Sequence, residues 1–128
     1  MSILDPFLEH LRFLGYKIQP DEQFVRAYHA SRWNLLVREF RGGVLFTAFL
    51  GGSAYAKQHP EAYLQLINAL NREATVARFY ADKDNDLVME AYWPGPYDRE
   101  RFAQFMDLWD EDTREHLAQQ GNASMFFE

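Results

Sequence analysis

Residues 33–50 read WNLLVREFRGGVLFTAFL, and this stretch predicts a β-hairpin. Both halves are rich in aromatic and β-branched residues, which favour strands. The pair Gly42-Gly43 between them indicates a two-residue loop, because glycine readily adopts the positive φ angles that such loops need. With this loop, Arg38 is expected to lie opposite Thr47. The hairpin therefore predicts an antiparallel sheet at the centre of the fold.

Helices and further strands flank this hairpin. The predicted elements are a helix from Asp5 to Gly15, strands at 24–30, 33–41 and 44–50, a helix at 60–71, strands at 75–81 and 87–93, and a helix from Asp98 to Gly121. Segment 24–30 also fits a helix, but the strands that follow favour a strand, and residues 16–23 are expected to form a turn. The order α-β(3)-α-β(2)-α predicts a two-layer α+β fold, in which helices cover one side of a mainly antiparallel five-stranded sheet.

Length and composition limit the class of protein. The chain has 128 residues, 48% of them hydrophobic, which suits one domain over residues 1–128 with 122–128 as a possible tail. It contains no cysteine, which excludes disulfides and thiol chemistry and agrees with a cytoplasmic location. No apolar run is long enough to span a membrane and the first residues do not resemble a signal peptide, so we expect no membrane association.

The charge balance argues against a nucleic-acid partner. The chain carries 13 basic and 19 acidic residues, for a net charge of −6, whereas general nucleic-acid binders are basic. The acid excess gathers in the last predicted helix, where we expect a solvated face formed by Asp107, Asp110, Glu111, Asp112 and Glu115. A weaker, opposite signal is a group that resembles a platform for single-stranded nucleic acid. Its members are Arg26, Arg32, Trp33, Arg38, Phe40 and Arg41.

Two patterns resemble parts of metal sites, but neither of them makes a complete site. Asp82, Asp84 and Asp86 match the start of a calcium loop, but Leu87 and Trp93 stand where such a loop needs a glycine and a carboxylate. A hairpin turn explains this segment better. The pair Asp112 and His116, four residues apart on a helix, is more typical of a surface ion pair than of a metal site.

No catalytic constellation accompanies these patterns. Ser53 follows two glycines but lacks the flanking residues of a phosphate loop or of a hydrolase elbow. We therefore expect no enzyme, no cofactor and no metal.

Three segments between Leu64 and Leu117 form a recognisable series. They are the helix end Leu66-Ile67-Asn68-Ala69-Leu70-Asn71, the acidic hairpin turn within Ala81–Glu90, and a helix with Phe102, Phe105, Met106 and Trp109. The series resembles the YbjN-like family of sensory-transduction regulators and the class I type III secretion chaperones that share its fold. The resemblance implies a small, often dimeric two-layer domain without a cofactor, and in the chaperone branch it implies binding of extended protein segments. Asn71 matches the recurrent asparagine of the family and is expected to satisfy backbone groups at the helix-to-strand turn.

Side-chain alternation divides the predicted sheet into two faces. If the second hairpin turns at Asp84, Arg78 lies opposite Glu90 as an exposed pair, and Phe79 lies opposite Met89. The face expected under the helices holds Leu35, Val37, Phe46, Ala48, Leu50, Ala77, Phe79, Leu87, Met89 and Ala91. The other face holds Arg38, Thr47, Arg78, Glu90 and Val76. It also holds large apolar residues that predict a partner or dimer surface, namely Leu36, Phe40, Leu45, Phe49, Tyr80, Val88 and Tyr92. An alternative is that a helix or the segment Met125-Phe126-Phe127 folds over that face.

These observations predict a non-enzymatic protein-binding domain of chaperone or regulator type. It would act through the aromatic-rich sheet face on another protein or on a second copy of itself as a homodimer. The alternative is a small ligand-binding protein or enzyme with a pocket between helices and sheet. No nucleic-acid or membrane partner is expected.

Overall fold

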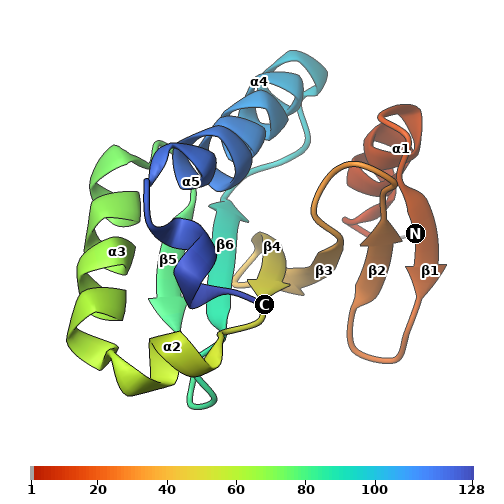
Figure 1. The fold of residues 1–128 in the computed structure, drawn as a ribbon. Coiled ribbons are helices and arrows are strands. Elements are labelled where there is room, and N and C mark those ends of the chain that lie inside the picture. Colours follow the sequence, from red (N-terminus) through yellow and green to blue (C-terminus); the bar gives the residue numbers. More distant parts are fainter. Residues whose placement is uncertain (1) are drawn as a thin grey trace.

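A six-stranded antiparallel sheet with helices packed on one face forms the fold (Figure 1). The computed structural model describes residues 2–128. In chain order the elements are α1 (Asp5–Phe13), β1 (Lys17–Pro20), β2 (Val25–Tyr28), β3 (Leu35–Phe40), β4 (Gly43–Leu50), α2 (Ala54–Gln58), α3 (Pro60–Glu73), β5 (Arg78–Ala81), β6 (Leu87–Trp93), α4 (Arg99–Asp110), the π-helix η1 (Glu111–Glu115), α5 (His116–Gln119) and the 3₁₀ helix η2 (Ala123–Phe126). The strand order is β1-β2-β3-β4-β6-β5. The predicted α+β class is confirmed.

The number of strands corrects the prediction from five to six. Residues 17–20, expected within a turn, form β1 and pair with β2 at the edge of the sheet. Pro20 is tolerated because it ends an edge strand, where its missing N–H costs little. Segment 24–30 contains strand β2, as preferred.

The first hairpin also differs from the prediction, because its loop is Arg41-Gly42. Both loop residues have positive φ angles, 49° and 80°, as a type I′ turn requires. Gly43 begins β4 instead, and a Cβ there would lie 2.1 Å from the Trp93 carbonyl oxygen. Arg38 therefore lies opposite Leu45, not Thr47. This shift of two residues keeps every side chain on its predicted face.

The second hairpin has the predicted register. Arg78 pairs with Glu90 and Phe79 with Met89. Asn85, with a φ of 64°, lies in the connecting turn. Polar turn chemistry between two β-rich segments was sufficient to predict this hairpin.

The core lies between the sheet and the helices. Its strand side holds the residues predicted for the covered face, all of them buried except Leu50, which is partly buried. Phe7 of α1 and Phe102 of α4 both pack against Phe46 of β4, with ring centroids 6.3 and 5.6 Å apart. Helices from both ends of the chain thus pack on the same strand.

The C-terminal segment packs on the helical side of the molecule. Phe126 of η2 is fully buried and stacks on Tyr63 of α3, with a centroid distance of 5.7 Å. The Ser53 N–H donates to the Phe126 carbonyl oxygen at 2.8 Å, and Phe127 forms a β-bridge with Gly52. Residues 123–127 therefore do not cover the opposite face of the sheet.

Asp112 joins the last helical segment to the chain that enters β5. Its carboxylate accepts backbone N–H groups from Thr75, Val76 and Ala77 at 2.7–2.9 Å. The Asp112 side chain is buried, so for this residue the predictions of a solvated face and of a surface ion pair with His116, 3.7 Å away, are wrong. Asp107 and Glu115 of the same predicted face are exposed. Asp112 and Thr113 are the buried residues of the π-helix η1.

We expect Asp112→Asn to destabilise the fold by about 2 kcal/mol, because hydrogen bonds to a buried carboxylate are strong and the amide can accept fewer of them. Urea unfolding measures this change. Glu115→Gln, at an exposed position of the same segment, is the control and should alter the free energy of unfolding by less than about 0.5 kcal/mol. Equal stabilities of the two variants would contradict the prediction.

Candidate functional site

The sheet face opposite the helices is the candidate site, and we call it the open face. All seven residues predicted for a partner or dimer surface lie on it by register. Phe49, Tyr80 and Tyr92 are 51%, 42% and 37% exposed. Leu36 and Phe40 are half-buried, whereas Leu45 and Val88 are buried beneath their larger neighbours. The face is thus a layer of exposed aromatic rings over an aliphatic floor.

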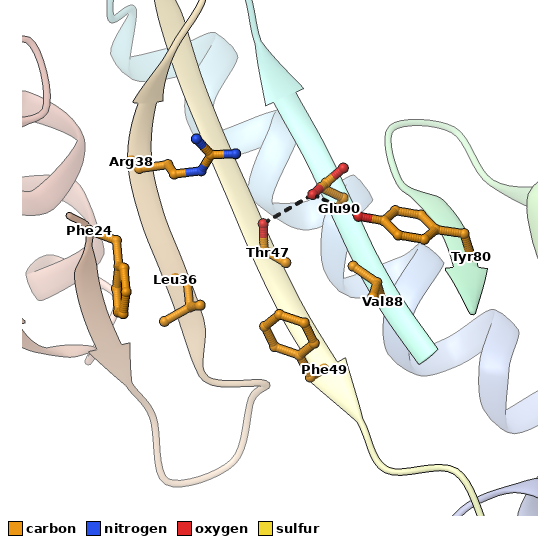
Figure 2. A pocket seen from close by; sticks show the side chains of 8 residues that line it. All are labelled: Phe24, Leu36, Arg38, Thr47, Phe49, Tyr80, Val88 and Glu90. Carbon is orange, nitrogen blue, oxygen red and sulfur yellow. Dashed lines mark hydrogen bonds between the residues drawn. The ribbon is translucent and has the colours of Figure 1, made fainter. Parts of the chain in front are cut away.

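A hollow of about 190 Å³ lies at the centre of the open face (Figure 2). It is lined by Phe24, Leu36, Arg38, Thr47, Phe49, Tyr80, Val88 and Glu90. A second hollow of about 560 Å³ shares Leu36, Thr47 and Phe49 and adds Arg26, Tyr28, Trp33, Asn34 and Leu35. Together they form a groove that runs from β5 toward β2.

The prediction had missed the β2 side of this groove. Phe24, Arg26 and Tyr28 lie on the open face because alternate residues of β2 project there. The alternation is present in the sequence and a strand is predicted at 24–30, but the predicted faces include only residues from Leu35 onward.

Glu90 is the polar centre of the open face. It is only 6% exposed, and its carboxylate accepts from Arg78 Nε at 2.8 Å. The hydroxyl groups of Tyr80 and Thr47 donate to its other oxygen at 3.3 and 3.4 Å, the latter drawn in Figure 2. The predicted Arg78–Glu90 pair is present, but only Arg78 is exposed. Three donors therefore compensate the burial of this carboxylate.

The Tyr80 hydroxyl depends on the same carboxylate. Burial raises the pKa of Tyr80 above its ordinary value, and the nearby Glu90 charge and hydrogen bond raise it further. The phenol therefore keeps its proton to a higher pH than an ordinary tyrosine does and serves as a donor to Glu90.

Arginines on the open face pack against its aromatic rings. The guanidinium groups of Arg38 and Arg41 lie 4.8 and 5.1 Å from the centroid of Phe40. Arg26 lies 5.0 Å from the Phe24 centroid and 3.5 Å from the Asp21 carboxylate. Positive charge is thus held directly beside apolar surface.

The layer between sheet and helices is filled by aromatic side chains. Phe46, Trp93, Phe102 and Phe105 pack there with ring centroids 5.3–5.8 Å apart. This packing offers no support for the alternative of a ligand pocket between helices and sheet.

In the acidic turn at residues 82–86, carboxylate side chains accept hydrogen bonds from backbone N–H groups. Asp82 accepts from the backbone N–H groups of Asp84 and Asp86, and Asp86 accepts from Gly52 N–H. Among residues 2–128, no group of three or more metal-ligating side chains is arranged to hold an ion. Within the same residues, no helix has the length and apolar character to cross a membrane.

Asn71 closes the β5 edge of the sheet. Its amide nitrogen donates to the Phe79 carbonyl oxygen at 2.9 Å, and its oxygen accepts the Phe79 N–H at 2.8 Å. It satisfies backbone groups as expected, but those of the strand itself rather than of the turn. The Asn71 side-chain amide thus pairs with Phe79 as the backbone of a neighbouring strand would.

Comparison with known proteins places the chain in a family. The YbjN family model, described as "Putative bacterial sensory transduction regulator", matches residues 4–119. The chain belongs to the YbjN family. A search of curated proteins finds none that matches.

Three solved structures have the YbjN-like fold of this chain. YbjN from E. coli, described as "a putative transcription regulator", has a TM-score of 0.74 at 18% identity over 100% of this chain and 98% of its own. An uncharacterized protein from Methanothermobacter thermautotrophicus has a TM-score of 0.65 at 11% identity over 91% and 95%. A chain of the heterodimeric ExoU-SpcU complex from the type III secretion system of Pseudomonas aeruginosa has a TM-score of 0.61 at 19% identity over 84% and 92%. The predicted resemblance is confirmed.

We expect Glu90→Gln to lower the pKa of Tyr80, because the substitution removes the negative charge that opposes ionisation of the phenol. Ultraviolet titration of the tyrosines measures this, with Tyr80→Phe identifying the signal. The exposed Glu100→Gln is the control and should leave the titration unchanged. An unchanged Tyr80 signal in Glu90→Gln would contradict the assigned contact.

Because the pKa of Tyr80 is raised in the folded protein, its contribution to the free energy of unfolding depends on pH in a defined direction. The folded protein retains the Tyr80 proton at a pH where the unfolded chain has lost it, so this contribution to stability is complete below pH 10 and falls as the pH rises further. Urea unfolding at increasing alkaline pH should show a shallower loss in Tyr80→Phe than in the natural chain.

Proposed function

We propose that this YbjN-family chain is a non-enzymatic protein-binding domain that captures a partner on the open face. The observation that carries the proposal is the exposure of Phe49, Tyr80 and Tyr92 on a sheet face that no helix within residues 2–128 covers. Large apolar surface exposed in one place is typical of interaction sites. Aromatic residues are enriched at the centres of such sites.

The comparisons support a regulator or chaperone type of action. The family is described as one of regulators, and the ExoU-SpcU structure is a complex between two proteins. The partner of the present chain would be another protein or a second copy. Dimerisation and a cytoplasmic location stay predictions.

We expect the double variant Phe49→Ser, Tyr80→Ser to weaken self-association or partner capture at least about tenfold, because both side chains lose their apolar contact area. Sedimentation measures self-association, and affinity capture with quantitative mass spectrometry measures other partners. The matched control is Phe13→Ser, Leu64→Ser, which removes two exposed apolar side chains from α1 and α3.

Two outcomes would count against the proposal. A double variant that fails to fold, judged by thermal unfolding, would show that the open face is ordinary core. A folded double variant that retains its oligomeric state and its partners as the control does would remove the open face from the binding function.

A further inference from the structure

We propose that the partner of the open face is an acidic polypeptide segment, extended in conformation, in which carboxylate side chains flank large apolar ones. This inference rests on the proposed function and adds the chemistry of the partner. It follows from the basic residues of the open face, from the two hollows that form the groove, and from the arginines that pack on Phe24 and Phe40.

Charge is segregated on this molecule. The strand residues that project from the open face include Lys17, Arg26, Arg38 and Arg78, against the carboxylates of Glu90 and of the loop residue Asp21, which pairs with Arg26. The whole chain, in contrast, carries a net charge of −6. The open face is therefore a basic surface on an acidic protein, and it is complementary to negative charge.

The cations of the groove remain available to a partner. Within residues 2–128, Arg38 forms no ion pair and rests on the Phe40 ring. The Arg26–Asp21 pair is nearly half exposed on both sides, so water screens it and its loss costs little. Glu90 is already held by Arg78 and two hydroxyl groups, which reduces its repulsion of an incoming carboxylate.

Both apolar and basic groups line the groove. Arg38 lines the central hollow together with Leu36 and Val88, and Arg26 lines the adjoining one together with Leu36 and Phe49. An apolar side chain that enters either hollow would bring neighbouring carboxylates of an extended segment near a guanidinium. The groove thus fits a segment that carries both kinds of side chain.

The same features disfavour nucleic acid and a second open face. Base stacking needs free ring faces, and guanidinium groups already occupy those of Phe24 and Phe40, which leaves Phe49, Tyr80 and Tyr92 for stacking. A long polyanion would also extend from the groove toward the acidic remainder of the chain. Two open faces in direct contact would bring basic groups together. An acidic peptide segment meets none of these obstacles.

A pair of synthetic peptides tests the inference. One is short and extended and alternates glutamate with valine and leucine; the other replaces each glutamate by glutamine. Fluorescence anisotropy should show that the acidic peptide binds about tenfold more tightly, and that rising salt reduces this difference. Arg26→Gln, Arg38→Gln should abolish the difference, whereas the matched control Arg72→Gln, Arg101→Gln, on α3 and α4, should keep it.

Each other outcome overturns the inference in a distinguishable way. Equal binding of both peptides that is lost in Phe49→Ser, Tyr80→Ser would refute the acid preference and leave the proposed function in place. Tighter binding of a single-stranded oligonucleotide, lost in Arg26→Gln, Arg38→Gln, would assign the groove to nucleic acid. Self-association lost in Phe49→Ser, Tyr80→Ser, with neither peptide bound, would assign it to a second copy. If neither peptide binds and the serine variant keeps its partners, the proposed function fails as well.

Discussion

The alternation of side chains along β4 is the constraint on which the rest of the structure depends. β4 lies between β3 and β6, so its two sets of side chains meet both neighbours. Val44, Phe46 and Ala48 pack beneath the helices, whereas Thr47 and Phe49 face the open side. Because the period is two, a slip of one residue would exchange these sets and expose the core. The open face and the core are thus specified by the same strand.

Polar contacts then secure the edge of the sheet to the helices. Asp112 accepts three backbone N–H groups before β5, and Asn71 pairs with both backbone groups of Phe79. An edge strand whose backbone is already paired is a poor template for another strand. At the opposite edge, Pro20 ends β1. These features reduce the backbone groups that each edge offers to another strand, which agrees with the proposal that binding takes place on the open face.

The open face combines two properties that are usually separated on protein surfaces. Its exposed aromatic rings supply apolar contact area, and Arg26, Arg38 and Arg41 lie against the rings of Phe24 and Phe40. Glu90 divides this surface and holds Arg78 and Tyr80 in place. Membership of the YbjN family is consistent with regulation through protein contacts. The charges of the groove support the proposal that the partner is acidic.

The sequence by itself determined which residues share a face of the sheet. Local alternation was sufficient to place Phe49, Tyr80 and Tyr92 together and to pair Arg78 with Glu90, because period-two patterning and turn residues act over short distances. The cap of α4 was equally local, since the Asp98 side chain accepts from the Arg101 N–H.

Only the tertiary structure decided the features that depend on distant segments. Gly43 is needed where β6 approaches, so the hairpin loop moves to Arg41-Gly42. Asp112 is buried because unpaired N–H groups before β5 lie next to η1, and residues 17–20 become a strand because β2 offers them a partner. Burial and pairing are properties of neighbours in space, which a local pattern does not contain.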